Sequence, residues 1–141
     1  MITIQACNHA DDRQTILVRL KAYNQTHCPW LAARPDAEPE QADLLAFDGS
    51  TLAGGIVGVV AYNWYVLDLL HVSEAYRRQD LGSRLLREVE AFTRQRGLTG
   101  IRLETWDCQA KDFYIKNGYQ IFAELPDCPP GSTVHFLKKP L

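Results

Sequence analysis

A short stretch, residues 76–86, carries the residue types that bind an anion. It reads YRRQDLGSRLL and brings two arginines and a glycine to the start of an amphipathic helix. A helix N-terminus presents unpaired N–H groups and the positive end of the helix dipole, which together favour a phosphate. Arg77 and Arg78 would add attraction, and Gly82 would admit a ligand close to the backbone. The alternative is a well-capped helix, in which Asp80 is the N-cap and the arginines are solvated.

The elements that position this stretch are indicated by hydrophobic periodicity. Strands are expected at residues 1–6, 44–47, 52–62, 65–72, 100–105, 119–124 and 133–137, and helices from residue 11 to about 23, from 82 to about 96 and from 109 to 116. The order strand, helix, three strands, helix, strand, helix, two strands predicts the α/β class, a mixed sheet with helices on its faces. The anion site would follow the strand at 65–72, where ligands of open α/β sheets usually bind.

The helix after Gly82 has the clearest pattern. Leu85 and Val89 belong to an apolar stripe at helical spacing. Glu90 and Arg94 are expected to pair across one turn on the solvent face. Gly97 is expected to close the helix in a left-handed conformation.

Composition limits the classes of function. The 141 residues predict one domain over 1–141, and the net charge of −2 argues against a surface that coats nucleic acid or anionic lipid. No apolar run approaches the roughly 20 residues of a membrane-spanning helix, and the N-terminus lacks the apolar stretch of a signal peptide. Cys7, Cys28, Cys108 and Cys128 are too far apart for metal-ligand spacing and are expected to be free thiols. These features predict a cytoplasmic protein without a metal.

Two segments, taken together, resemble the GNAT superfamily of acyl-CoA-dependent N-acyltransferases. Residues 77–82, RRQDLG, resemble the family motif of Arg or Gln, two variable residues, Gly, one variable residue and Gly or Ala, placed after a core strand. Residues 113–119, FYIKNGY, resemble the F-Y-x-x-x-G-[FY] signature of the last helix and strand. The resemblance covers nearly the whole chain, strongly from residue 44 onward. It implies a mostly antiparallel central sheet in the order β-α-β-β-β-α-β-α-β-β with helices on both faces.

The resemblance also implies roles for individual residues. The backbone of residues 70–72 would pair with the pantetheine arm of acetyl-CoA, and the amides of residues 77–83 would bind the pyrophosphate. Tyr114 would be the general acid at the leaving thiolate, a role that suits a phenol with a pKa near 10. The residues expected to bind the cofactor are Leu70, His71, Val72, Arg77, Arg78, Gln79, Asp80, Leu81, Gly82, Ser83, Gln109 and Phe113.

Asp80 departs from the family pattern, which usually has glycine there. Its carboxylate could repel the pyrophosphate, and its Cβ restricts the backbone, although Asp tolerates left-handed torsions better than most residues. We expect the side chain to turn away and cap the helix, so that cofactor affinity is lowered rather than abolished.

Acetyl transfer to an amine also needs a group that accepts a proton. Asp68 is the first candidate, because it lies on the strand at 65–72 and by strict alternation shares a face with Leu70 and Val72. Asp68 could instead bind the amine, or be held by neighbouring backbone. Glu104 is the second candidate, with a structural ion pair as its alternative role. His135 has no paired carboxylate nearby in sequence and is expected at the surface.

The sequence therefore predicts an N-acetyltransferase that uses acetyl-CoA and a small amine, by direct attack in a ternary complex. A non-catalytic acyl-CoA-binding or partner-binding module with the same fold is the alternative, favoured by Asp80. A nucleic-acid or membrane partner is not expected. Exposed strand edges and the habit of the family are compatible with a homodimer.

Overall fold

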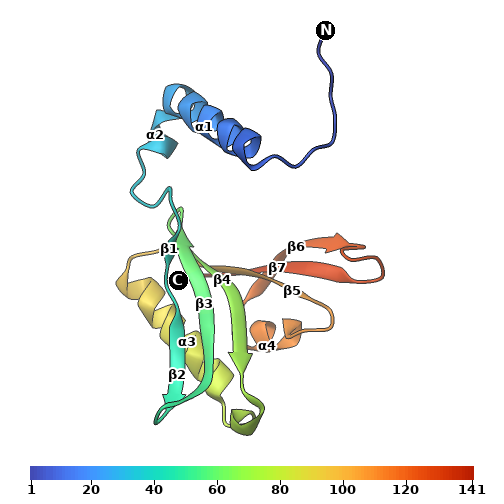
Figure 1. Cartoon of the computed structure of the whole chain (residues 1–141). Helices are drawn as coiled ribbons and strands as arrows, with labels where there is room; N and C mark the ends of the chain where they lie inside the picture. Colours follow the sequence, from blue (N-terminus) through green and yellow to red (C-terminus); the bar gives the residue numbers. More distant parts are fainter. The chain divides into compact units, whose positions relative to one another are not determined.

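The computed structural model describes all 141 residues, which form two compact units, Met1–Ala37 and Glu38–Leu141. The first unit consists of helices α1 (Ala10–His27) and α2 (Pro29–Ala32), coloured blue in Figure 1. Asp11 and Asp12 lie in the first turn of α1, where their charges favour the positive end of the helix dipole. The helix predicted from residue 11 is therefore confirmed.

The strand predicted at residues 1–6 is wrong. Residues 1–9 adopt no regular secondary structure. Alternating apolar residues favour an extended backbone, but a strand exists only through hydrogen bonds to a neighbour, and these residues pair with no other strand. The seventh strand of the sheet is instead the two-residue β1 (Glu40–Gln41), whose polar residues give no periodic signal.

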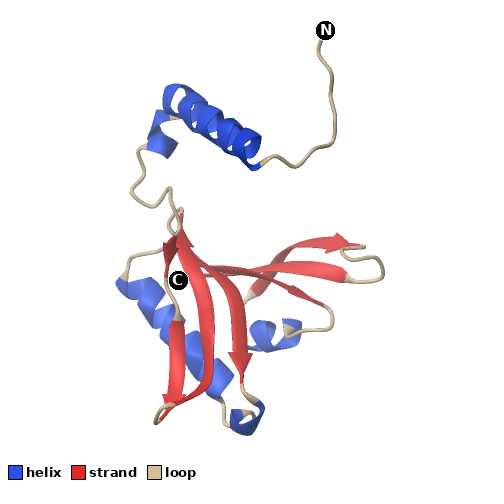
Figure 2. Ribbon diagram, in the orientation of Figure 1, coloured by secondary structure: helices blue, strands red, loops and turns tan.

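The second unit is built on one seven-stranded sheet (Figure 2). Its remaining strands are β2 (Leu44–Asp48), β3 (Thr51–Ala61), β4 (Trp64–Val72), β5 (Gly100–Trp106), β6 (Gln120–Pro126) and β7 (Thr133–Pro140). The order is β1-β3-β4-β5-β7-β6, with β2 also paired to β3, and every pair is antiparallel except β4–β5. The predicted mixed, mostly antiparallel sheet is confirmed.

Two helices of this unit, α3 (Leu81–Gln95) and α4 (Lys111–Lys116), pack against one face of the sheet (Figure 1). The apolar stripe of α3 is buried, with Leu86 and Val89 fully inaccessible. Each such side chain contributes roughly 1.5–3 kcal/mol by leaving water. Gly97 closes α3 with a φ of 65°, as predicted for a left-handed position. The 3-10 helix η1 (Glu74–Tyr76) joins β4 to the start of α3.

One prediction about α3 is wrong. Glu90 does not lie on the solvent face, since only 6% of it is exposed. Its Oε1 accepts a hydrogen bond from Lys139 Nζ at 2.8 Å. Its Oε2 lies 4.0 Å from Arg94 Nη2. The lysine that neutralises Glu90 lies 49 residues further along the chain, so helical spacing alone could not reveal it.

The sheet opens between its two parallel strands. The β4–β5 ladder ends at the pair Leu67↔Leu103, and beyond it the strands separate, as Figures 1 and 2 show. At the same level Asp68 is an extra residue on β4, because Leu67 pairs with Gly58 and Leu69 pairs with Val57. This β-bulge and the separation of the strands together position the site.

Candidate active site

The loop before α3 forms a row of free backbone donors. Arg78 and Asp80 have φ values of 63° and 60°, left-handed positions that turn the chain sharply. The backbone N–H groups of residues 78–83 donate to no carbonyl of the chain. Arg77 Nε donates to the carbonyl of Val72 at 3.1 Å, which ties the loop to the end of β4. Consecutive free N–H groups at a helix N-terminus form a concave anion site.

The Asp80 side chain is turned toward helix α3. It accepts a hydrogen bond from Arg87 Nη2 at 3.0 Å. That bond, together with one from Ser83 and the charges of Arg87 and Arg84, holds the pKa of Asp80 below its usual range. The predicted capping hydrogen bond is absent, since the left-handed backbone at Asp80 does not aim the carboxylate at the first N–H groups of the helix.

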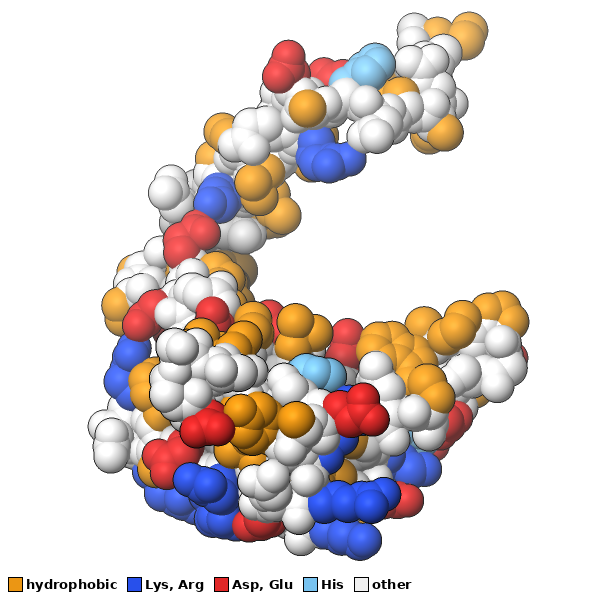
Figure 3. Space-filling view, turned by 60° about the horizontal axis from the view of Figure 1, so that its bottom comes forward, with side chains coloured by type: hydrophobic (Ala, Val, Ile, Leu, Met, Phe, Trp, Pro, Cys, Tyr) orange, Lys and Arg blue, Asp and Glu red, His pale blue; other side chains and the backbone are white.

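A pocket lies over these donors, which we call the loop pocket. It is lined by residues 76–78 and 80–83, together with Val72 and Phe113. A Cβ at Gly82 would lie 3.2 Å from the Phe113 ring, so glycine lets α4 pack closely on the start of α3. The structure thus brings together the predicted cofactor-binding segment, the end of β4 and α4. Basic side chains gather along the lower edge in Figure 3, with acidic side chains between them.

From Asp68 onward, β4 offers an unpaired backbone edge. The backbone of residues 70–72 pairs with β3 on one side, and β5 has separated from it on the other. Unpaired strand edges bind extended chains through main-chain hydrogen bonds. Leu70 and Val72 pack against the core, whereas the His71 side chain is exposed. The backbone of His71 thus lies on this unpaired edge, and its predicted contact with the pantetheine arm stays a prediction.

Tyr114 lies in the core beneath the sheet, with 6% of it exposed. Its ring makes edge contacts with Phe113 and Tyr119, with centroids 5.3 and 5.7 Å away. Burial raises the pKa of Tyr114 to about 12. Its hydroxyl has no hydrogen-bond partner in the chain. A neutral hydroxyl in an apolar setting is suited to donate to a developing negative charge.

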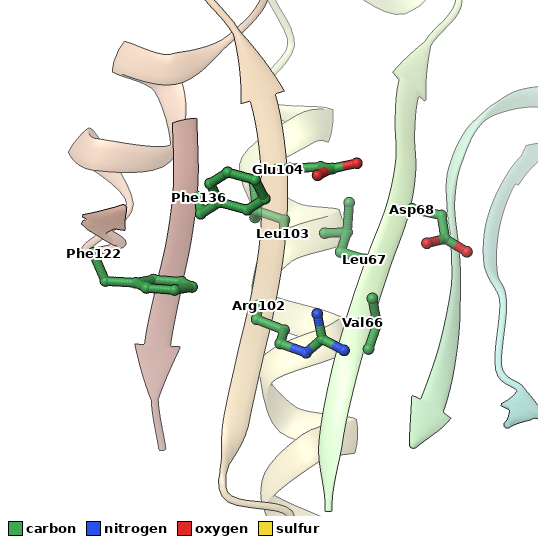
Figure 4. Close-up of a pocket in the computed structure, with 8 residues that line it drawn as sticks. All are labelled: Val66, Leu67, Asp68, Arg102, Leu103, Glu104, Phe122 and Phe136. Atoms are coloured by element: carbon green, nitrogen blue, oxygen red, sulfur yellow. The ribbon is translucent and has the colours of Figure 1, made fainter. Parts of the chain in front are cut away.

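A second pocket lies on the opposite face of the sheet, where β4 and β5 separate; we call it the β4–β5 pocket (Figure 4). Its volume is about 190 Å³, and eight residues line it. Leu67 and Leu103, which also belong to the core, lie at its base, so the pocket reaches into the sheet at the point of separation. In Figure 4 the Glu104 carboxylate extends from β5 toward β4, whereas Asp68 extends from β4 toward β3.

The bulge changes the predicted orientation of Asp68. The side chain lines the β4–β5 pocket with Val66, on the face opposite to Leu70 and Val72. Strict alternation predicted the same face for all three, and the extra residue at Asp68 inverts that relation.

Gln109 lies apart from the loop pocket. Its Oε1 accepts hydrogen bonds from Thr105 Oγ1 at 3.0 Å and from the Trp106 N–H at 3.4 Å. It lines a third pocket, between the end of β5 and the β6–β7 turn. Gln109 therefore lies in a pocket separate from the loop pocket, and its predicted contact with the cofactor stays a prediction.

The surface position predicted for His135 is wrong. The residue is 4% exposed, and its Nε2 lies 2.5 Å from Asp107 Oδ1. Its Nδ1 lies 3.3 Å from Glu124 Oε1 without a hydrogen bond. Asp107 also accepts the N–H of Thr133 at 3.0 Å, so the cluster joins the end of β5 to β6 and β7. Both carboxylates come from other elements, which is why no sequence pattern marked this histidine.

Comparisons with known proteins agree with this geometry. Residues 5–119 match the Acetyltransferase (GNAT) family, and the chain belongs to that family. It is 41% identical over 133 residues to the Blasticidin-S acetyltransferase of Streptomyces morookaense. The aligned region covers 89% of this chain and 98% of that relative. Its fold is similar to an acetyltransferase from Bacillus cereus ATCC 14579, with a TM-score of 0.81, 26% identity and coverage of 99% and 98%. It is also similar to an aminoglycoside 6′-N-acetyltransferase complexed with coenzyme A, with a TM-score of 0.67, 20% identity and 95% of each chain covered.

The chain is an acyl-CoA-dependent acetyltransferase, and the acyl donor of this family is acetyl-CoA. Two observations fit that donor: the free N–H groups over the loop pocket suit a diphosphate, and the unpaired edge of β4 suits an amide-bearing arm. No three His, Cys, Asp or Glu side chains lie close enough to hold a metal ion. None of the helices combines the length and apolar character that crossing a bilayer requires.

Proposed function

We propose that the chain transfers an acetyl group from acetyl-CoA to a primary amine on a small molecule, by direct attack in a ternary complex. The observation that carries this proposal is the opening between β4 and β5. It has the anion-binding loop at one end and the β4–β5 pocket on the opposite face of the sheet. Donor and acceptor can therefore meet at one gap while each occupies its own pocket.

In the proposed reaction, residues 77–83 and the edge of β4 hold the donor. Acetyl-CoA supplies a thioester whose carbonyl carbon bonds to the amine nitrogen while its bond to sulfur breaks. Tyr114 donates a hydrogen bond, and finally a proton, to the departing sulfur, and its phenolate then regains a proton from solvent. The high pKa of about 12 keeps this hydroxyl protonated at neutral pH.

The amine must lose a proton to balance the one that the thiolate gains. We assign that proton to Glu104, because its carboxylate extends into the gap between the strands (Figure 4). Asp68 lines the same pocket from β4 and is the alternative acceptor. Glu104→Gln should lower turnover at low pH more than at high pH, since the amine is increasingly neutral as the pH rises. Asp68→Asn provides the matched comparison.

The test is release of free thiol from acetyl-CoA across a panel of amines. Blasticidin S, the compound in the name of the 41% identical relative, is the first acceptor to assay. Mass spectrometry should show a product one acetyl group heavier than the acceptor. Tight acetyl-CoA binding without turnover on any amine would instead support a non-catalytic module, the function that Asp80 would favour.

A further inference from the structure

The β4–β5 pocket contains two opposite charges that do not neutralise each other. Arg102 and Glu104 both lie on β5, two residues apart, so their side chains point to the same face about 7 Å from each other along the strand. Neither makes an ion pair or a hydrogen bond with any group of the chain. Both are therefore free to bind opposite charges on one ligand.

The pocket also contains two aromatic rings. Phe122 of β6 and Phe136 of β7 line it, with ring centroids 6.4 Å apart and planes inclined by 50°. Phe122 is 52% exposed, so its ring is accessible to a ligand. Lys138, the other cation near these rings, lies 5.6 Å over Phe122. Exposed rings beside a polar pocket supply a surface on which a flat ligand can pack.

We propose that the β4–β5 pocket selects an acceptor in which a flat ring joins a primary amine to a carboxylate. Arg102 binds the carboxylate, Glu104 receives the amine, and the two phenylalanines pack against the ring. This inference rests on the proposed acetyl transfer and adds the class of the acceptor.

The charge arrangement sets the spacing of the ligand. The amine must reach the gap where the strands separate, and Glu104 extends into that gap. Arg102 lies two residues earlier on the strand, next to the last paired residues. The carboxylate should therefore lie about 7 Å from the amine, the separation of alternate residues along a strand. A guanidinium can bind a carboxylate through two parallel hydrogen bonds, which makes Arg102 selective rather than merely attractive.

Three matched amines test the inference. The probe is 4-(aminomethyl)benzoate, which places an amine and a carboxylate at opposite ends of a flat ring. The comparison amine 4-methylbenzylamine lacks the carboxylate, and trans-4-(aminomethyl)cyclohexanecarboxylate keeps both charges on a ring that is not flat. Calorimetry on the protein saturated with coenzyme A measures binding, and thiol release measures turnover, so the two are read separately.

The expected result is that the probe binds about tenfold more tightly than 4-methylbenzylamine, because a charged hydrogen bond is gained. It should bind several-fold more tightly than the cyclohexane analogue, because aromatic packing is gained. Arg102→Gln should remove the first preference and keep the second. Phe122→Leu should do the reverse. Lys116→Gln removes an exposed cation on α4 and should change neither preference.

Equal binding of the probe and 4-methylbenzylamine would overturn the inference, and so would a preference that survives Arg102→Gln. If thiol release occurs without that preference, the proposed acetyl transfer stands and the acceptor class fails. If the preference appears in calorimetry but no thiol is released from any amine, the pocket binds this class of ligand but the proposed transfer fails, and with it the ligand's role as acceptor.

Discussion

Charged side chains on the two faces of the sheet differ in whether the protein neutralises them. On the face that packs against α3 and α4, Glu90 is paired with Lys139, and His135 lies against Asp107. On the opposite face, Arg102 and Glu104 line a pocket and pair with nothing in the chain. Both sets lie on or next to the same strands, β5 and β7.

The difference separates structural charges from charges that are available to a ligand. A buried charge costs several kcal/mol unless a partner and hydrogen bonds compensate it, so the helix-covered face retains only compensated charges. Charges in an open pocket remain solvated and lose little free energy without a partner. Substitution on the covered face should therefore change stability, and substitution in the β4–β5 pocket should change acceptor binding.

Tyr114 lies on the helix-covered face, but its polar group is not compensated, because the residue is buried and its hydroxyl has no hydrogen-bond partner in the chain. Tyr114→Phe should lower turnover on the order of 10²-fold, the loss typical of a removed general acid, while acetyl-CoA binding is unchanged. Steady-state thiol release and calorimetry measure the two quantities. Tyr62→Phe, at an exposed turn between β3 and β4, is the matched control. Unchanged turnover would remove Tyr114 from the mechanism and place it among the structural residues.

Lys139→Met should give the largest loss of stability. It leaves the Glu90 carboxylate buried with only the long 3.5 Å hydrogen bond from the Tyr119 hydroxyl and the more distant Arg94. We expect the free energy of unfolding to fall by about 2–3 kcal/mol. Urea titration measures this. Lys138→Met, the neighbouring residue on the other face, should change the free energy of unfolding by less than about 1 kcal/mol.

The double variant Glu90→Leu, Lys139→Met sharpens that result. Removing both charges leaves no unpaired carboxylate, so much of the lost stability should return. If the double variant were as unstable as Lys139→Met alone, the pair itself, rather than the orphaned charge, would be the source of the stability.

Asp107 should make the stability of the fold depend on pH. The hydrogen bonds from His135 and from the Thr133 backbone hold the pKa of Asp107 below its usual range. Such a carboxylate stabilises the fold above its unfolded pKa, near 4, and that contribution is lost as the pH falls through the lower folded pKa. Asp107→Asn should therefore be less stable than wild type at neutral pH and should lose less on acidification below pH 4.

Urea titrations at a series of pH values measure the effect of Asp107→Asn. Asp68→Asn is the control, because Asp68 makes no ion pair or hydrogen bond in the chain. Parallel curves for wild type and Asp107→Asn would show that the cluster around His135 does not contribute to acid stability.

Local sequence predicted much of the region proposed to bind acetyl-CoA, the loop before α3 and the helix that follows it. The loop depends on residues adjacent in the chain, so the glycine and the helix start at residues 81–83 indicated where it lies, and the family resemblance favoured an anion site over a capped helix. The helix boundary at Gly97 was predictable for the same reason. The family resemblance named Phe113 only as a cofactor-binding residue, and its place against Gly82 became known only from the fold.

The β4–β5 pocket, proposed to bind the acceptor amine, could not be predicted in the same way. Its pocket exists because a bulge at Asp68 and the end of the β4–β5 ladder coincide, and neither leaves a periodic signal. His135 and Asp107 are 28 residues apart, so their contact depends on the folded topology. The strand predicted at residues 1–6 failed for a related reason, since alternation describes one strand and not the neighbour that must pair with it.

Asp80 belongs to neither group of charges, because its carboxylate has a partner in the chain and also borders a ligand pocket. Its carboxylate binds Arg87 but remains next to the donors of the loop pocket.

Asp80→Asn keeps a side chain that tolerates a left-handed φ and removes only the charge. Acetyl-CoA should then bind about two- to fivefold more tightly at low salt, and the gain should shrink as salt screens the repulsion. Calorimetry at two salt concentrations measures this, with Glu88→Gln on the exposed face of α3 as the control. Equal affinities for wild type and Asp80→Asn would mean that Arg87 neutralises the carboxylate completely. Asp80 would then belong with Glu90 and Asp107, among the charges that the protein itself compensates.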